Sequence, residues 1–361
     1  MNATQNLSIA VDCRMSGKSG IGTFLDGILP HLCKESSKVL LIGSEEILKC
    51  YKANENVNVE LCNVKPFSIK EIFFFPKKIA QKINKCDAYY SPYCNIPCGI
   101  RIPIFTTIHD IIFLDVKGLT GVLGTFIRKC FYLYAIKRSK AIFTVSQFSR
   151  QRIREKLHCK KPIFIAYNGL PSYLIEKQIK ETASIEKEPI ILFVGNIKKH
   201  KGLSVLIEAF SDFSKQTDAK LVIVGDKDNF RTKDTQTQEL FKNFSDKITF
   251  TGRISNDDLY VLLKKASVLV QPSYYEGFGI PPLEALACGT NAIVSDIPVF
   301  KEIYGTLPVH FFKTGDSKNL MEKLTEVWNT EPKNGIIPES YSYKVSAQKI
   351  VAEIVTFIHA D

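Results

Sequence analysis

Residues 272–289 hold the side chains with the most evident capacity for chemistry. Glu276 lies in a loop that contains two glycines. Glu284, eight positions later, lies in the first turn of a predicted helix that Pro281 and Pro282 begin. Carboxylates accept hydrogen bonds from hydroxyl pairs, and the unpaired N–H groups at a helix start favour a phosphate. The segment therefore indicates a pocket for a phosphorylated sugar or a nucleotide sugar, and a surface loop with two solvated glutamates is the alternative.

The run from Glu276 to Glu284, EGFGIPPLE, resembles the Glu-x7-Glu signature of the retaining glycosyltransferases of the GT-B fold, sequence family 4. The resemblance covers nearly the whole chain and is strongest over residues 195–302. It implies an α/β protein with two Rossmann-like domains whose parallel sheets face a cleft. It also implies that the second domain holds most of the nucleotide sugar and that the last helix crosses back to the first domain.

The resemblance also implies roles for individual residues. Glu284 would bind the donor ribose, Glu276 would contact the transferred sugar, and Lys201 would stabilise the departing diphosphate. His109 follows a predicted strand and would contact the sugar from the first domain. The implied catalytic residues are therefore His109, Lys201 and Glu276. The implied donor-binding residues are Gly20, Gly22, Asn196, Lys201, Arg253, Ile254, Phe278, Gly279, Ile280 and Glu284.

One position departs from the family pattern. Asn196 stands where many members carry an arginine that binds the diphosphate, and Lys198 or Lys199 is a candidate to supply the missing charge. A non-catalytic scaffold that binds a nucleotide or a glycan is the alternative that this departure supports. No Asp-x-Asp pair follows a predicted strand, so we expect no metal and no cofactor besides the nucleoside-diphosphate sugar donor.

The candidates in the first half have alternatives of their own. Residues 16–24 form a glycine turn that leads into a helix, and a tight turn that binds nothing is the alternative for Gly20 and Gly22. A histidine hydrogen-bonded within the fold is the alternative for His109. The glycine turn lacks the third glycine of a dinucleotide-binding fingerprint. We therefore expect neither NAD binding nor a nucleotide-sugar epimerase.

Composition and patterning predict the domain organisation. The chain has 361 residues, of which 45% are hydrophobic and 24% charged, and this is the balance of a soluble globular protein with room for two domains. We expect a first domain over residues 1–172, a polar linker over 173–188, a second domain over 189–340 and a returning helix over 341–361. Without a signal-peptide pattern or a run of eighteen apolar residues, we expect a cytoplasmic protein whose ten cysteines are reduced.

The net charge of +11 is concentrated in one segment. Residues 119–161 contain eleven Lys and Arg but a single acidic residue, Glu155, and aromatic residues lie among them. This pattern indicates an anionic membrane surface as a partner, or else a helix with one buried and one solvated face; motifs for nucleic-acid binding are absent. With the resemblance, it favours a lipid-linked glycan acceptor in bacterial surface polysaccharide assembly and a GDP-mannose or UDP-sugar donor. A soluble small-molecule acceptor is the alternative.

Overall fold

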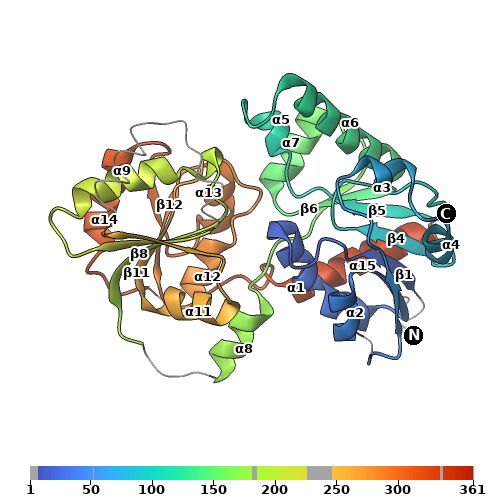
Figure 1. Cartoon of the computed structure of the whole chain (residues 1–361), viewed down its shortest axis with the longest axis horizontal. Helices are drawn as coiled ribbons and strands as arrows, with labels where there is room; N and C mark the ends of the chain where they lie inside the picture. The colour runs from blue at the N-terminus through green and yellow to red at the C-terminus, as the bar shows by residue number, and fades with distance from the viewer. Residues whose placement is uncertain (1–6, 52, 181–184, 226–245, 334–335, 361) are drawn as a thin grey trace. The chain divides into compact units, whose positions relative to one another are not determined.

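The computed structural model describes residues 7–51, 53–180, 185–225, 246–333 and 336–360 (Figure 1). The chain divides into two compact units. The first comprises Met1–Gly169 together with Glu339–Asp361, and the second comprises Leu170–Pro338. Each unit contains a parallel sheet with hydrophobic clusters between the strands and their helices, so the predicted α/β class with two parallel sheets is confirmed.

In the described residues, the first unit has a seven-stranded sheet of order β3-β2-β1-β4-β5-β6-β7, paired in parallel throughout. The strands are β1 (Ser8–Asp12), β2 (Lys38–Gly43), β3 (Val57–Leu61), β4 (Ala88–Ser91), β5 (Ile104–Thr107), β6 (Ala141–Thr144) and β7 (Ile163–Ile165). The central strands are short apolar runs that are buried on both faces, as a covered parallel sheet requires. The strand order reverses between β1 and β4.

The helices of the first unit come from both ends of the chain. They are α1 (Ser19–Glu35), α2 (Glu45–Tyr51), α3 (Ile69–Phe73), α4 (Lys77–Ile83), α5 (Ile112–Asp115), α6 (Val122–Arg138), α7 (Gln147–Leu157) and α15 (Tyr343–His359). The last helix, α15, packs against α1. Gly27 permits this contact, because a Cβ at that position would lie 2.3 Å from the ring of Tyr343. Ser346 adds a hydrogen bond of 2.6 Å to the carbonyl of Tyr167.

The second unit has, in its described part, a six-stranded parallel sheet of order β10-β9-β8-β11-β12-β13. The strands are β8 (Glu188–Val194), β9 (Lys220–Val224), β10 (Ile248–Gly252), β11 (Ala266–Gln271), β12 (Asn291–Ser295) and β13 (His310–Phe312). The helices are α8 (Ser172–Lys180), α9 (Leu203–Phe213), α11 (Asn256–Lys265), α12 (Pro281–Ala287), α13 (Pro298–Tyr304) and α14 (Ser317–Val327), with a 3₁₀ turn, η2, at Lys199–Lys201. Here the strand order reverses between β8 and β11.

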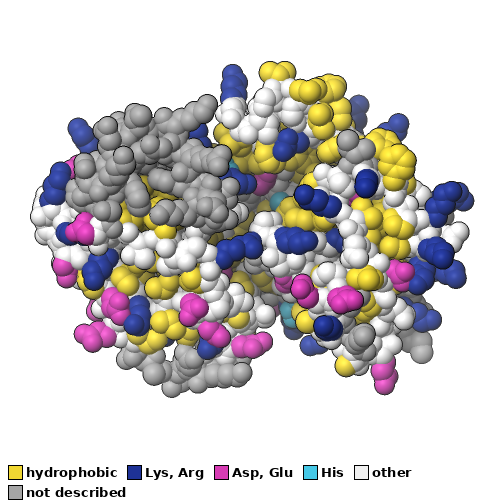
Figure 2. Space-filling model, in the orientation of Figure 1, with side chains coloured by type: hydrophobic (Ala, Val, Ile, Leu, Met, Phe, Trp, Pro, Cys, Tyr) yellow, Lys and Arg dark blue, Asp and Glu magenta, His cyan; other side chains and the backbone are white. Residues whose placement is uncertain are grey.

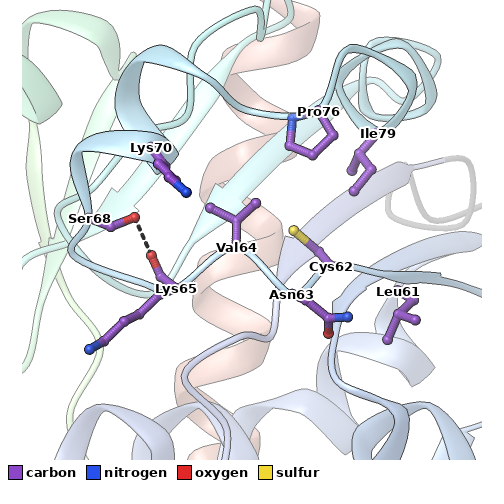
Figure 3. A pocket seen from close by; sticks show the side chains of 9 residues that line it. All are labelled: Leu61, Cys62, Asn63, Val64, Lys65, Ser68, Lys70, Pro76 and Ile79. Atoms are coloured by element: carbon purple, nitrogen blue, oxygen red, sulfur yellow. Dashed lines mark hydrogen bonds between the residues drawn. The ribbon is translucent and has the colours of Figure 1, made fainter.

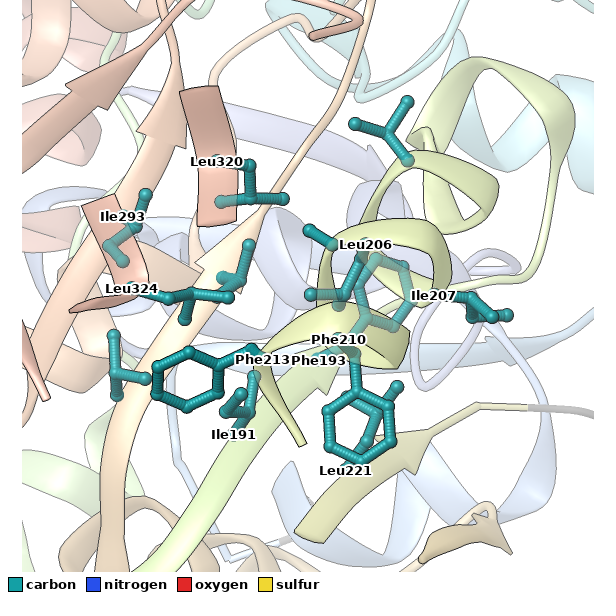
Figure 4. Packing of buried hydrophobic residues seen from close by; sticks show 14 of the residues in the cluster. Ile191, Phe193, Leu206, Ile207, Phe210, Phe213, Leu221, Ile293, Leu320 and Leu324 are labelled. Atoms are coloured by element: carbon teal, nitrogen blue, oxygen red, sulfur yellow. The ribbon is translucent and has the colours of Figure 1, made fainter. Parts of the chain in front are cut away.

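A large hydrophobic cluster fixes α9 and α14 against this sheet (Figure 4). Phe210 of α9 and Leu324 of α14 are both fully buried and meet strand residues such as Ile191 and Phe193. A second cluster contains residues of α8, α11 and α12 together with the same sheet. The two clusters hold the carboxyl ends of β8 and β11, from which the candidate site is built, on a rigid support.

The structure differs from the predicted linker over residues 173–188. Helix α8 occupies much of that segment, and its Leu174 is fully buried in the second unit. The polar composition of the segment concealed this because one buried leucine and one tyrosine, Tyr173, are enough to attach the helix. Residues 181–184 lie outside the described part of the chain. Across the described ranges, no helix is both long enough and apolar enough to traverse a lipid bilayer.

Candidate active site

The two loops that follow β8 and β11 carry the main predicted residues of the second unit. These strands are neighbours, and the strand order reverses between them. In an open parallel sheet the loops at such a reversal diverge and leave space for a ligand at the carboxyl ends of the strands. The loop after β8 leads to Lys201, and the loop after β11 leads to Glu276. The topology therefore brings together two residues that are far apart in the sequence.

Lys201 and Glu276 form an ion pair. The Lys201 ammonium donates to both carboxylate oxygens of Glu276, at 2.6 and 2.8 Å. Ser273 Oγ donates to the same carboxylate at 2.7 Å and Gln271 Nε2 at 3.2 Å. Glu276 is only 8% exposed, so its carboxylate is held in one orientation by three donor groups. The sequence analysis named Lys201 and Glu276 but missed Ser273 and Gln271, whose side chains have no distinctive spacing.

Gly202 allows the two loops to approach. Its φ is +67°, and a Cβ at this position would lie 1.9 Å from the carbonyl oxygen of Pro272. Only glycine fits both the backbone conformation and the contact. The backbone N–H of Tyr274 also donates to the carbonyl of His200 at 2.8 Å and joins the loops directly. These contacts position Lys201 for its ion pair with Glu276.

His200 lies beside the ion pair and was not predicted. It is buried, and its Nδ1 has no hydrogen-bond partner among the residues that the structure describes. Burial and, to a smaller extent, the neighbouring Lys201 charge lower the pKa of His200 to about 4. The imidazole is therefore neutral at pH 7. The positive charge that pairs with Glu276 comes from Lys201.

Glu284 has a separate environment. It lies in the first turn of α12, which begins with two prolines and is followed by Gly289 at a φ of +66°. Its partner is the hydroxyl of Tyr173, at 3.4 Å, in the segment that was predicted to be linker. Burial raises the pKa of Glu284 to about 7. A buried carboxyl whose hydrogen bond to Tyr173 is this long retains acceptor capacity for a ligand's hydroxyl groups.

The segment between the two glutamates is tightly packed. Phe278 is buried, and Gly279 has a φ of +83° with Phe300 so close that a Cβ would lie 2.4 Å from its ring. The hydroxyl of Tyr304 donates to the carbonyl of Gly279. Ile280 is partly buried and precedes α12. Phe278 therefore acts as a packing residue. The backbone of Gly279 and Ile280 lies directly before the first turn of α12.

The remaining candidates of the second unit lie nearer the surface. Asn196 is exposed in the loop after β8, and so are Lys198 and Lys199. Arg253 is exposed after β10, while Ile254 packs against the hydrophobic cluster of α8 and α11. Within the described residues, no three His, Cys, Asp or Glu side chains are grouped so that they could hold a metal ion.

In the first unit, His109 follows β5 and is partly buried. Its Nε2 lies 2.9 Å from the carbonyl oxygen of Pro92, and its ring meets Phe24 edge to face at 5.0 Å. Burial lowers the pKa of His109 to about 4. A carbonyl can only accept, so Nε2 carries the proton of the neutral ring and Nδ1 is an acceptor. His109 can therefore accept a hydrogen bond from a ligand hydroxyl.

Gly20 and Gly22 lie in the first turn of α1 rather than in the preceding turn. The turn itself uses Gly17, which has a φ of +66°. Gly22 is required by packing, because a Cβ there would lie 2.5 Å from the carbonyl oxygen of Met15. A Cβ at Gly20 would meet nothing within 4 Å, so this position leaves open space beside the helix start.

A buried charged network at the end of β1 was not predicted. Arg14 donates to Asp12 at 2.5 and 2.9 Å, to Glu71 at 2.7 Å and to the Tyr93 hydroxyl at 2.9 Å. None of these four residues is more than 4% exposed. The same carboxylates accept further hydrogen bonds from Tyr89, Asn95 and the backbone of Phe67. Its members come from three separate segments, so no local pattern could have indicated it.

Comparison with solved structures identifies the fold. The fold is that of sucrose-phosphate synthase from Thermosynechococcus elongatus, with a TM-score of 0.71, 17% identity and coverage of 99% of this chain and 100% of that chain. It is also that of HepE from Anabaena, solved with UDP and glucose, with a TM-score of 0.66, 16% identity and coverage of 98% and 99%. The chain therefore has the two-domain GT-B fold.

Sequence comparison then gives the family. Residues 175–340 match the family model described as glycosyl transferases group 1. The chain is 34% identical over 185 residues to the O-antigen chain mannosyltransferase RfbU of Salmonella typhimurium, covering 50% of this chain and 50% of that protein. It is 29% identical over 311 residues to an uncharacterized glycosyltransferase of Methanocaldococcus jannaschii, covering 79% and 78%. The chain thus spans about half the length of the mannosyltransferase.

Proposed function

We propose that the protein is a retaining glycosyltransferase that needs no metal. It transfers a hexose from GDP-mannose or a UDP-sugar to a lipid-linked glycan in surface polysaccharide assembly. The observation that carries this proposal is the Lys201–Glu276 ion pair at the strand reversal of a group 1 glycosyltransferase domain. The name of RfbU, an O-antigen chain mannosyltransferase, supports the choice of a hexose and of a glycan acceptor.

The proposed chemistry places charge stabilisation on Lys201. As the bond between the anomeric carbon and the diphosphate oxygen breaks, the sugar becomes oxocarbenium-like and negative charge builds on the diphosphate. An ammonium has three N–H donors, and Glu276 receives two of them, so the third can point at a phosphate oxygen. Fixed charge of this kind stabilises a leaving group without reorganisation. Glu276 orients Lys201 and offers its remaining lone pairs to a hydroxyl of the transferred sugar.

Further residues have roles in the proposal. Glu284 binds the ribose diol of the donor, and the backbone N–H groups at Gly279 and Ile280 face its diphosphate. His109, which is a hydrogen-bond acceptor at Nδ1, binds a hydroxyl of the sugar. One of the exposed lysines Lys198 and Lys199 provides the charge that Asn196 lacks. Arg253 and Ile254 contact the base, and Gly20 leaves room for a ligand at the start of α1.

Titration of UDP, GDP and ADP into the wild-type protein and a Glu284→Gln variant tests the donor site. We expect one nucleotide to bind the wild type and to bind the variant at least tenfold more weakly, because glutamine offers the diol one acceptor oxygen instead of a charged pair. Calorimetry measures both affinities. Absence of binding by all three nucleotides would contradict the proposal.

The affinity should also depend on pH. Ribose hydroxyl groups stabilise the carboxylate form of Glu284, whose pKa in the free protein is about 7. Binding should therefore release a proton near pH 7 and weaken as the pH falls below 7, approaching tenfold per unit. The folding stability of the protein without ligand depends on pH in the opposite direction. The raised pKa favours folding below pH 4.5, and that stability, about 3 kcal/mol, is lost as the pH rises through 7. Glu284→Gln should remove both dependences.

A membrane partner is the second part of the proposal, and α6 supports it. Val122, Leu123, Phe126 and Ile127 are 91%, 71%, 62% and 42% exposed on successive turns of this helix. Figure 2 shows hydrophobic side chains gathered over α6 with Lys and Arg nearby. Apolar side chains flanked by basic ones on one helix favour an interface with anionic lipids. The acceptor would then be reached at the inner face of the membrane.

Vesicle sedimentation tests this surface. A Leu123→Glu, Phe126→Glu double variant should bind phosphatidylglycerol vesicles at least tenfold more weakly than the wild type, because two charges would have to enter the interface. Ile336→Glu is the matched control, since Ile336 is 94% exposed in the second unit and should leave binding unchanged. Equal binding by the double variant and the wild type would favour a soluble acceptor instead.

A further inference from the structure

A pocket of about 770 Å³ lies beyond the end of β3 in the first unit, apart from every residue assigned above to the donor (Figure 3). It is lined by Leu61, Cys62, Asn63, Val64, Lys65, Ser68, Lys70, Pro76 and Ile79. This volume is in the range of sites for small molecules. In Figure 3, Val64, Cys62, Pro76 and Ile79 face the same space as the Lys70 ammonium, and Lys65 extends away from it.

The buried charged network fixes one wall of this pocket. Arg14 Nη1 donates to the carbonyl of Val64 at 3.2 Å, and Glu71 accepts from the backbone N–H of Phe67 at 2.8 Å. Ser68 donates to the carbonyl of Lys65 at 2.6 Å and caps α3. Phe67 has a φ of +58°, which is a strained conformation for a non-glycine residue. A wall that is strained and is held by buried charges indicates a preformed site rather than a surface irregularity.

The lining selects for two chemical features together. Its floor is apolar, and its ionisable groups other than the buried Cys62 thiol are two lysines. Two acids adjoin the lining in the sequence: Glu71 is fully buried and paired with Arg14, and Glu60 is paired with Lys82. Phe73 and Phe74, in the segment that joins Lys70 to Pro76, are 66% and 73% exposed. A lining that combines apolar surface with positive charge is complementary to a ligand whose apolar chain ends in an anionic group.

The pocket and the membrane-facing helix belong to one core. Cys62 and Ile79 from the pocket pack in the same hydrophobic cluster as Ala135 and Tyr134 of α6. The two features therefore occur in the same part of the first unit. Ala135 and Tyr134 lie in the last turns of α6, whereas its exposed apolar residues lie in the first turns.

We infer that this pocket binds the phosphate-bearing end of an anionic amphiphile, with the apolar chain against Val64 and Ile79 and the phosphate at Lys70. In the proposed reaction, on which this assignment rests, the amphiphile is the carrier lipid of the glycan acceptor. The pocket thereby specifies the acceptor class through its lipid phosphate and is separate from the residues proposed to bind the donor.

Calorimetric titration with decyl phosphate, below its micellar concentration, tests the pocket directly. The wild type should bind decyl phosphate at least tenfold more tightly than decanol and should not bind inorganic phosphate at the same concentrations. Lys70→Glu should weaken decyl phosphate binding at least tenfold. Lys78→Glu is the matched control, because Lys78 is exposed in the same basic segment but does not line the pocket, and its effect should stay within twofold.

A Val64→Trp variant separates shape from charge. It should weaken both decyl phosphate and decanol by filling the pocket, with an unchanged far-UV spectrum as the check on folding. Equal effects of Lys70→Glu and Lys78→Glu, or full binding by Val64→Trp, would overturn the inference. Competition by farnesyl phosphate points to an isoprenoid carrier and competition by dihexanoyl phosphatidylglycerol to a phospholipid, and both support the pocket.

The failure of this inference is distinct from the failure of the proposed function. Lys70 is not among the residues proposed to bind the donor, so the affinity of Lys70→Glu for the nucleotide should match that of the wild type. If no nucleotide binds any variant while decyl phosphate binds the wild type, the donor assignment fails and the amphiphile site stands. In a transfer assay, Lys70→Glu should raise KM for a lipid-linked acceptor at least tenfold and leave KM for the donor unchanged.

Discussion

Replacing Lys201 by methionine is expected to lower the rate of glycosyl transfer by about a hundred- to a thousandfold. Methionine keeps most of the apolar stem but removes the ammonium that we propose for the leaving diphosphate. Glu276 loses its charged partner and keeps Ser273 and Gln271, so the second unit should lose only about 1–3 kcal/mol of stability. The measurement is kcat with saturating donor, together with a thermal melt of each protein.

Two comparisons make the result specific. Lys215→Met removes a surface lysine that forms an exposed ion pair with Asp212, and it should leave the rate unchanged. If Lys201 and Glu276 act as a unit, the double variant with Glu276→Gln should be no slower than the slower single variant. A rate within threefold of the wild type for Lys201→Met would remove Lys201 from the mechanism.

Replacing Arg14 by methionine is expected to destabilise the first unit by about 3–5 kcal/mol at pH 7. The substitution leaves two fully buried carboxylates, Asp12 and Glu71, without their cation. Burial already raises the pKa of Glu71, and Arg14 is the main group that lowers it. Without Arg14 this pKa rises further, so the destabilisation should shrink as the pH falls and the carboxyl takes up a proton.

Denaturant titration followed by tryptophan fluorescence and by far-UV circular dichroism distinguishes an effect on the first unit from one on the second. Trp328 is the single tryptophan of the chain and packs on Phe213 in the second unit, so its fluorescence midpoint should not move. The far-UV transition of the first unit should shift to lower denaturant. Arg101→Met, at an exposed arginine, is the control. Adding Glu71→Gln to Arg14→Met should restore part of the loss, and a shift no larger than that of the control would contradict the prediction.

The sequence was informative where local chemistry determines structure. The prolines and glycines around Glu284 predict the loop, the helix start and the helix end of α12, and all three are present. Lys201 and Glu276 were named from a resemblance to a family, but their contact depends on β8 and β11 being neighbours. That adjacency is a property of the sheet and cannot be derived from either loop.

Other features could not be predicted because tertiary contacts create them. Tyr173 lies in a polar segment. Its hydroxyl can donate a hydrogen bond to Glu284 only when the neighbouring Leu174 packs in the core. Asp12 and Arg14 look like ordinary residues at the end of a strand until Glu71 joins them from α3. A membrane partner was predicted from the charge of residues 119–161 and stays a prediction, whereas the exposed apolar residues of α6 are evident only in the folded unit.

The return of α15 to α1 has a consequence for biosynthesis. The first unit needs residues from both ends of the chain, since Gly27 of α1 packs on Tyr343. A ribosome synthesises all of residues 170–338 before it reaches α15. The second unit can therefore complete its folding on the nascent chain, while the first unit waits with the apolar face of α1 uncovered. Chaperones that bind exposed apolar helices would meet this protein in that interval, before translation ends.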